Sequence, residues 1–325
     1  MRTIIHVKNC LKGFLSTILL TLFTATTHAE KVVIIPLLGG EVQKISNVVT
    51  VAKSGGDYTD PLSAVNSIKD ASETKPYLVF IAPGIYNLDR ALTMKPHVSV
   101  RGSGSRNTIL TGSISGAASV DAALVLAASE SELSNLTMEN IVAGDGNRVY
   151  GAFAQDVSQF FMKDVVIRVK ADAGSSFAAG FVSVNSNITF DEMDVSAGAI
   201  DEQTPLSVVG VLSTDGGSGS YWSNMMVRGV GFGLSGVGIQ LVNSSPTITN
   251  SEIIGRSTGI FNFGNSKPRI ESSIVSALSS DGIAVSLANP SARIIKTQVR
   301  EVVSGFPSTT QCKGVYNEDL EEVSF

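Results

Sequence analysis

Short apolar runs alternate with polar turns along most of this chain, and between residues 238 and 305 the pattern repeats three times. Each copy opens with a Gly-Ile pair, and these pairs begin at Gly238, Gly259 and Gly282. A polar turn with a proline follows, and then a second apolar run that contains Ile248, Ile270 or Ile294. The copies lie 21 and 23 residues apart, and a fixed period in this range indicates stacked repeats.

The apolar runs are four to six residues long and rich in Val, Ile and Phe, with Gly, Ser, Asn and Pro between them. Runs this short, bounded by turn formers, predict strands rather than helices. A coil of about 20 to 30 residues built from short strands is one turn of a parallel β-helix, and the crossover rule makes it right-handed. The expected fold is therefore all-β, a single-stranded right-handed parallel β-helix.

Looser copies of the repeat precede the clear ones, and they begin at Gly151, Gly180 and Gly210. The fifth residue after each opening glycine recurs in type: Asp156, Asn185, Asp215 and Asn243, followed by Gly264 and Leu287 in the last two copies. Asp and Asn tolerate left-handed turns and hydrogen-bond the neighbouring backbone. We therefore expect these side chains to stack at a turn of the coil, in a structural role.

Residues 1–29 resemble a secretory signal peptide, with basic residues first, an apolar segment from Phe14 to Ala25, and a small-residue cleavage site near Ala29. The apolar segment is too short for a convincing membrane span, which needs about 20 residues. The prediction is an exported protein that is periplasmic, secreted or at the cell surface, without stable membrane insertion after cleavage. An uncleaved N-terminal anchor is the alternative.

The clearest helix signal covers about residues 60–72, where Asp60 suits the N-cap and Pro61 the first helical position. Apolar residues at helical spacing continue the signal as far as Ile68. A solenoid exposes its first coil, so an amphipathic helix here is expected to cap the N-terminal end. The predicted β-helix domain is residues 30–305, and residues 306–325 form a C-terminal tail.

The net charge of the chain limits the classes of partner that the protein is expected to bind. Without residues 1–29 the chain keeps 21 basic and 29 acidic residues, a net charge of −8, with no cluster of Lys and Arg in sequence. Nucleic acid is therefore not an expected partner. Cys312 is the one cysteine that remains, so no internal disulfide is expected. His97 is the one remaining histidine, and neither a metal site nor a cofactor is predicted.

Several segments between about residues 51 and 112 resemble a known family: KSGGDY, the helix Pro61 to Ile68, KPYLVFIAPGIYNL and VSVRGSGSRNTILTG. They are similar to the opening of the pectin-methylesterase branch of the pectin-lyase-like superfamily. The whole chain also resembles secreted bacterial β-helix repeat proteins of unassigned function, through its IIPL segment and its Cys-x-x-Val-Tyr tail from Cys312 to Tyr316. Both resemblances imply a parallel β-helix.

The resemblance to pectin methylesterases would imply two catalytic aspartates and a positioning arginine. Asp172 and Asp201 lie nearest the expected places, but their flanking residues depart from the family motifs. Leu88 stands where the family has a glutamate, and the Leu-Gly-Arg-Pro-Trp motif is absent. Solvated turn residues are the alternative for both aspartates. Asp164, Asp191 and Asp194 are remote candidates for glycoside hydrolysis, which needs carboxylates on adjacent coils of one face.

Three aromatic residues are candidates for ligand binding: Tyr221, Trp222 and Phe232. Exposed aromatic rings on the side of a β-helix can stack on sugar rings, while an inward Trp would fill the core. Both interpretations are open for Trp222. The glycine-rich stretch around them lacks a phosphate-binding ending and is expected to form turns of the coils.

Three functions remain open. The first is a non-catalytic solenoid that binds a polysaccharide or another cell-surface ligand. The second is a divergent carbohydrate esterase or depolymerase of the pectinesterase type, which requires Asp172, Asp201 and an arginine to converge. The third is a trimeric adhesive or tailspike-like structural protein, which predicts an apolar strip on one outer face; a monomer suits the first two.

Overall fold

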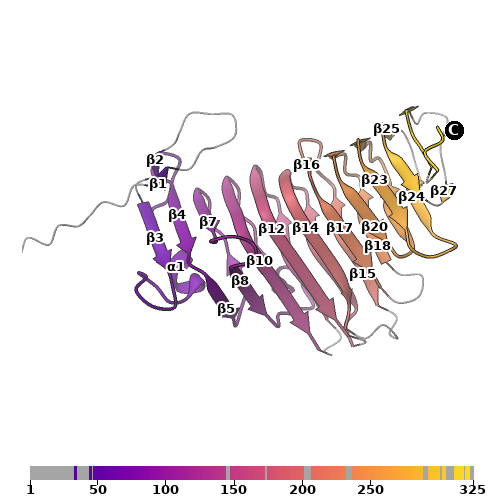
Figure 1. Ribbon diagram of the computed structural model, residues 1–325. Coiled ribbons are helices and arrows are strands. Elements are labelled where there is room, and N and C mark those ends of the chain that lie inside the picture. Colours follow the sequence, from indigo (N-terminus) through magenta and orange to yellow (C-terminus); the bar gives the residue numbers. More distant parts are fainter. Residues whose placement is uncertain are drawn as a thin grey trace, which may run out of the picture. The chain divides into compact units, whose positions relative to one another are not determined.

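Figure 1 shows the computed structural model of the chain, in which strands of successive coils stack side by side. The structure describes residues 33–34, 44–45, 47–143, 147–172, 174–200, 206–231, 236–287, 292–300, 302–304, 311–317 and 319–322. These residues belong to one compact unit, Val32–Phe325. The predicted signal peptide, residues 1–29, lies outside the described residues.

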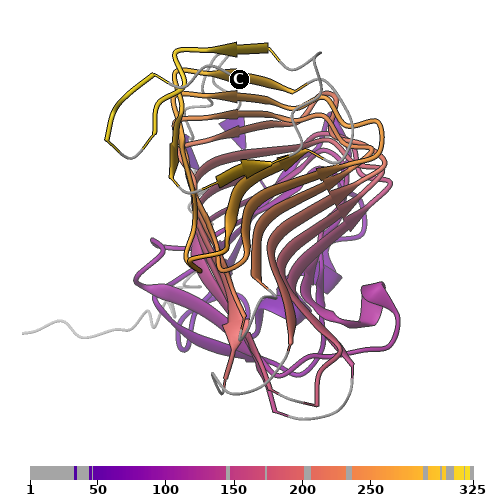
Figure 2. The same cartoon turned by 90° about the vertical axis from the view of Figure 1, so that its right-hand side faces the viewer.

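The strands form three parallel faces, and each coil contributes a strand to one face after another. Figure 2, with the C-terminal coils toward the viewer, shows the strands of one face lying behind one another. We call them face 1, face 2 and face 3. The parallel β-helix expected from the repeat is therefore confirmed.

Face 1 consists of β3 (Asn47–Val51), β4 (Tyr77–Ile81), β7 (Val98–Arg101), the first halves of β10 (Ser131–Val142), β12 (Phe160–Ala171) and β14 (Ile188–Ala199), then β16 (Tyr221–Ser223), β19 (Thr247–Thr249), β22 (Arg269–Glu271), β25 (Arg293–Ile295) and β28 (Gln311–Lys313). Face 2 consists of β5 (Gly84–Leu88), β8 (Thr108–Gly112), the second halves of β10, β12 and β14, then β17 (Met226–Val230), β20 (Glu252–Gly255), β23 (Ile274–Ala277) and β26 (Gln298–Arg300).

Face 3 consists of β6 (Leu92–Thr93), β9 (Ala123–Leu126), β11 (Arg148–Gln155), β13 (Phe177–Val184), β15 (Ser207–Thr214), β18 (Gly236–Val242), β21 (Thr258–Phe263), β24 (Ile283–Leu287) and β27 (Val302–Ser304). Outside the three faces lie the antiparallel pair β1 (Val33–Ile34) and β2 (Lys44–Ile45), the helix α1 (Pro61–Ser67) and the 3₁₀ turn η1 (Ser119–Asp121).

The interior is filled by columns of apolar side chains, one from each coil. The isoleucines that mark the repeat in the sequence, Ile248, Ile270 and Ile294, stand in register on β19, β22 and β25 and are fully buried. The N-terminal continuation of this column is Trp222, and the C-terminal continuation is Cys312. Stacking of like residues along the axis gives every coil a packing partner on both sides.

The opening glycines of the repeat form a ladder on face 3, at Gly151, Gly180, Gly210, Gly238 and Gly259. A Cβ atom on any of them would lie 2.5 or 2.6 Å from the backbone oxygen at the same position of the next coil. The sixth position is occupied by Ala284 and not by Gly282, because β24 pairs Val285 with Ile260. The register expected for the last copy was therefore wrong by two residues, and Leu287 is a buried strand residue rather than a turn residue.

The expected stack of Asp and Asn at a turn is confirmed. Asp156, Asn185, Asp215 and Asn243 all have left-handed backbone conformations, with φ between 46° and 55°. The amide nitrogen of Asn185 donates to Asp156 at 2.7 Å, and that of Asn243 donates to Asp215 at 2.9 Å. A second left-handed column marks the bend between faces 1 and 2, at Asn135, Asp164, Glu192, Asn224, Asn250, Ser272 and Lys296.

The helix α1 begins where the sequence predicted, with Pro61 in the first turn and the Asp60 carboxylate accepting hydrogen bonds from the backbone of Leu62 and Ser63. It ends at Ser67, before the expected boundary near residue 72, because Ile68 is extended. Lys95 donates to the backbone oxygens of Asn66 and Ile68 at this end of the helix. The apolar residues of α1 pack into the main core beside the first coils.

Within the segment expected as a tail, residues 306–325, the described residues 311–317 add to the stack of coils. Within it, β28 extends face 1, and Tyr316 forms a parallel bridge to Gln298 that extends face 2. Val315 is buried, and Cys312 packs against the core, where burial raises the pKa of its thiol. The Cys-x-x-Val-Tyr segment thus closes the last coil. Among the described residues, no helix is long and apolar enough to cross a membrane.

Candidate functional site

The outer surface of face 1 carries two aromatic side chains in one column. Phe161 on β12 pairs with Thr189 on β14, which pairs with Tyr221 on β16. Phe161 and Tyr221 are each 47% exposed, and the residue between them in the column, Thr189, is polar. Two strand spacings separate the two rings, which corresponds to about 10 Å along the axis of the coils. We call Phe161, Thr189 and Tyr221 the aromatic platform.

The hydroxyl of Thr249, on the next strand of face 1, donates a hydrogen bond of 3.1 Å to the phenol oxygen of Tyr221. This bond restrains the ring across the surface of the sheet, and a restrained ring loses less conformational entropy when a ligand binds. A ligand-binding role for Tyr221 stays a prediction, and its exposure and its orientation are those that such a role requires.

The side chain of Trp222 points into the core, opposite to that of Tyr221. It is fully buried, its indole nitrogen donates to the backbone oxygen of Ile188 at 3.2 Å, and its ring packs on Phe190 at 5.4 Å. Strand alternation sends neighbouring side chains to opposite faces, so Tyr221 and Trp222 cannot both face a ligand. Trp222 is therefore a core residue and not a surface stacking residue. Phe232, the third aromatic candidate, lies outside the described residues.

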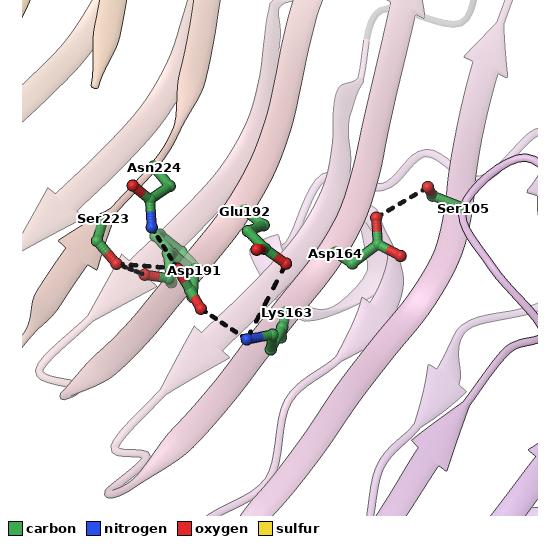
Figure 3. Close-up of polar contacts among 8 residues, drawn as sticks. Ser105, Lys163, Asp164, Asp191, Glu192, Ser223 and Asn224 are labelled. Carbon is green, nitrogen blue, oxygen red and sulfur yellow. Dashed lines mark hydrogen bonds and ion pairs between the residues drawn. The ribbon is translucent and has the colours of Figure 1, made fainter. Parts of the chain in front are cut away.

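A polar cluster lies beside the platform, in the neighbouring outward column of face 1 (Figure 3). The ammonium group of Lys163 on β12 contacts the carboxylate of Asp191 on β14 at 2.9 Å. Asp191 also accepts hydrogen bonds from Asn224 at 2.8 Å and from Ser223 at 3.1 Å. The side chains of three successive coils are thus linked by one carboxylate.

The pKa of Asp191 is lowered: burial of the carboxyl raises it, but the hydrogen bonds from Lys163, Asn224 and Ser223 outweigh that effect. The pKa of Lys163 is raised, chiefly by its hydrogen bond to Asp191. Both groups are therefore held in their charged forms at neutral pH. A carboxylate that accepts hydrogen bonds from three donors can link neighbouring strands. It is poorly suited to act as a general acid or base, because its ionised form is stabilised.

Two further carboxylates stand at the bend between faces 1 and 2 (Figure 3). Asp164 accepts a hydrogen bond from Ser105 at 2.9 Å, and Glu192 lies 4.0 Å from the ammonium group of Lys163. Asp194 is directed outward on face 2, where it contacts Arg228 at 3.6 Å. Asp191 and Glu192 thus both face Lys163, whereas Asp194 faces Arg228. No group of three His, Cys, Asp or Glu side chains in the described ranges is placed to hold a metal ion.

An open groove of about 540 Å³ follows the same bend toward the C-terminal coils. Met226 and Ile274 provide apolar surface, and Asn250 and Glu252 provide polar groups. Asn224 lines the groove and also binds Asp191, so the groove and the polar cluster are continuous. The groove is shallow and open to solvent, so a ligand that lies in it would be contacted along one side.

Asp172, the first catalytic candidate, lies in the turn between β12 and β13. Its carboxylate accepts a hydrogen bond of 3.0 Å from the backbone of Gly174, and its backbone oxygen accepts one from Ser175. These contacts are those of a turn residue. Asp201 lies outside the described residues, so the expected convergence of the two aspartates stays a prediction.

Sequence reasoning missed Phe161, Lys163 and Asn224. The segment Phe160-Phe161 holds the one signal that could have found the platform, since one of two adjacent aromatic residues in a strand must point outward. Lys163 and Asn224 gave no such signal, because their meeting with Asp191 depends on the register of three coils.

Comparison with known proteins supports the fold. No family model matches the sequence, and no curated protein matches it. Pectin methylesterase PemA from Erwinia chrysanthemi is similar in structure, with a TM-score of 0.50 and 12% sequence identity over 87% of this chain and 92% of that one. The carrot pectin methylesterase gives a TM-score of 0.44 with 15% identity over 85% of this chain and 82% of its own.

A third similar structure is the A-module of mannuronan C-5 epimerase AlgE4 from Azotobacter vinelandii, with a TM-score of 0.33 and 15% identity over 79% of this chain and 89% of that module. At such identities the likeness concerns the fold and not the chemistry. The similarity to PemA therefore supports the parallel β-helix fold of this chain and concerns the fold alone.

Proposed function

We propose that this protein is a non-catalytic, polysaccharide-binding β-helix whose ligand lies on face 1, across the strands and along the axis of the coils. The observation that carries the proposal is the aromatic platform, in which Phe161 and Tyr221 expose nearly half of their surface in one column. Aromatic faces are the usual surface on which a sugar ring packs, because they pair apolar area with a fixed geometry.

The surroundings of the platform suit a sugar ligand. Thr189 lies between the two rings, and the polar cluster of Lys163, Asp191 and Asn224 lies beside them. Hydroxyl and amide groups fix the orientation of a ligand that stacking alone would leave free to slide. The groove at the bend extends this surface over further coils, so a chain of several sugars is a better match than a single one.

The esterase alternative gains no support from the described residues. The three donors around Asp191 occupy that carboxylate, and Asp172 is bound to its own turn. As part of the same proposal, the predicted signal peptide would export the protein, so that it meets polysaccharides of a cell surface or its surroundings.

The test is a calorimetric titration of the full chain with neutral polysaccharides, beginning with fully methyl-esterified polygalacturonate. Phe161→Ala and Tyr221→Ala are each expected to weaken binding about tenfold, which corresponds to roughly 1.4 kcal/mol. Phe263→Ala is the matched control, because Phe263 is 51% exposed but lies on face 3. Folding of each variant is checked by the emission of Trp222, the single tryptophan of the chain.

Equal losses in the Phe161 and Phe263 variants, or no binding by the unsubstituted chain to any neutral polysaccharide, would overturn the proposal. Release of acid from the esterified polymer, followed at constant pH, would show an esterase instead. Abolition of that release by Asp172→Asn or Asp201→Asn would identify the residues that sequence reasoning selected.

A further inference from the structure

The C-terminal end of face 1 gathers three cationic side chains from separate coils. Arg269 on β22 pairs with Arg293 on β25, and Lys313 lies on β28 in the neighbouring outward column. All three line a surface pocket of about 380 Å³, together with Gln311, Ile295 and Cys312. The sequence shows no cluster of basic residues here, because each of the three belongs to a different coil.

The charge of this end is opposite to that of the protein. The outward residues of β22, β25 and β28 are Arg269, Glu271, Arg293, Ile295, Gln311 and Lys313. Three of them are cationic and one is anionic, so this surface has a formal charge of +2 in a chain with a net charge of −5. A local positive surface on an acidic protein focuses anions onto that surface.

Of these six outward residues only Glu271 has a carboxylate, and it is already engaged, while the Glu322 carboxylate accepts a hydrogen bond from the backbone of Gly314 next to Lys313. Glu271 accepts a hydrogen bond of 2.7 Å from the Nε of Arg269, and the same two side chains form an ion pair. Among the described residues, no side-chain hydrogen bond or ion pair involves Arg293 or Lys313. Like charges on directly opposed strand residues are unfavourable, and Arg269 and Arg293 are such a pair.

A bound anion would offset this repulsion. A guanidinium offers a planar set of donors that matches an oxyanion in two places, and an ammonium adds a point charge. The amide of Gln311 can complete the set as a neutral donor. The pocket is open to solvent at the surface of the sheet, so a group that projects from a polymer can enter it.

We propose that Arg293, Lys313 and Gln311 form an oxyanion-binding site, which takes a carboxylate or sulfate group of an acidic polysaccharide. The site stands on its own charges and does not depend on the aromatic platform. The platform and the site nevertheless share one outward column of face 1, through Tyr221, Thr247, Arg269 and Arg293. One extended polymer could therefore contact both.

The experiment is a titration of the full chain at low ionic strength with two matched pairs of polymers. Polygalacturonate is compared with its fully methyl-esterified form, and dextran sulfate with dextran, so that only the anionic group differs within each pair. We expect the chain to bind at least one anionic polymer at least tenfold more tightly than its neutral partner. The pair that shows the preference identifies carboxylate or sulfate as the group.

The double variant Arg293→Gln/Lys313→Gln is expected to remove that preference and to leave binding of the neutral polymers unchanged. The double variant Lys170→Gln/Arg300→Gln is the matched control, because it removes the same charge from exposed residues of face 2. An equal loss in the control would show a general effect of net charge and overturn the site. If the unsubstituted chain binds the anionic and neutral polymers equally, the oxyanion site is overturned as well. If the unsubstituted chain prefers the anionic polymer but binds no neutral polymer, only the proposed role of the aromatic platform is contradicted.

Discussion

Face 1 and face 3 expose aromatic rings to a similar extent but differ in what surrounds the rings. The strands of face 3 from β13 to β24 contain no charged residue, and the exposed ring of Phe263 stacks on the half-buried ring of Phe261 at 6.4 Å. On face 1 the exposed rings of Phe161 and Tyr221 have Lys163, Asp191 and threonine hydroxyls as neighbours. Exposed aromatic area is thus common to both faces. The charged groups that could orient a sugar belong to face 1, whereas the cross-strand neighbours of Phe261 on face 3 are the uncharged Gln240 and Ser286.

The two faces also differ in how they meet the core. Face 3 brings neighbouring backbones close together through its glycine ladder, and its outward residues from β18 to β24 mix apolar side chains such as Phe261 and Phe263 with polar ones such as Gln240 and Ser286. Assembly into a trimer stays a prediction. Face 1 keeps large side chains inside, including Phe190 and Trp222, and its outer surface combines the aromatic platform with charged and hydroxyl groups. Substitutions can test whether the stability of face 3 depends on close backbone contacts and that of face 1 on side-chain contacts.

The largest effect is expected from Gly210→Ala on face 3. A Cβ atom at this position would lie 2.5 Å from a methyl carbon of Val227 and 2.6 Å from the backbone oxygen of Gly238. Neither neighbour can move without shifting a coil, so we expect a loss of about 3 kcal/mol in the free energy of unfolding. Urea unfolding followed by Trp222 emission measures it.

Gly198→Ala on β14 is the control for this substitution. Its Cβ atom would have one close neighbour, the backbone oxygen of Val230 at 3.3 Å. We expect a change within about 0.5 kcal/mol. Similar losses for Gly198→Ala and Gly210→Ala would show that the ladder has no special role in face 3.

A smaller effect is expected from Asp191→Asn on face 1. The lowered pKa of Asp191 means that its ionised form stabilises the fold above the ordinary value of 3.8, and that this contribution disappears as the pH falls through the lower folded-state pKa. Because the partner Lys163 is 39% exposed and solvent screens the pair, we expect a loss of less than about 1 kcal/mol at pH 7.

Urea unfolding of Asp191→Asn and the unsubstituted chain at neutral pH and near pH 2 measures the difference. The difference should shrink as the pH falls through the lowered folded-state pKa of Asp191 and its carboxyl becomes protonated. Asp89→Asn is the control, since the Asp89 side chain is 75% exposed and its substitution should have little effect at either pH. A difference that stays constant with pH would mean that Asp191 acts through shape and not through charge.

Sequence reasoning succeeded where one coil determines its own structure. The repeat period, the inward isoleucines such as Ile270, the Asp and Asn turn column, and the cap of α1 at Asp60 each depend on a few neighbouring residues. Local patterns of this kind are written directly in the sequence, because each coil repeats the same contacts.

It did not succeed where function depends on register between coils. The order of Phe160 and Phe161 does not tell which ring faces out, and the meeting of Lys163 with Asp191 needs the alignment of β12 and β14. The last copy shows the same limit, because a shift of two residues moved the ladder position from Gly282 to Ala284. Such alignments depend on small changes in turn length, and the amino-acid composition of a coil does not reveal these changes.

The most direct measurement is hydroxyl-radical footprinting of the full chain with and without a bound neutral polysaccharide. Oxidation of Phe161 and Tyr221 should fall in the presence of the ligand, while oxidation of Phe261 and Phe263 stays unchanged. This result would locate the ligand on face 1 without any substitution. Protection of Phe261 and Phe263 with no change at Phe161 and Tyr221 would contradict the account and assign the ligand to face 3.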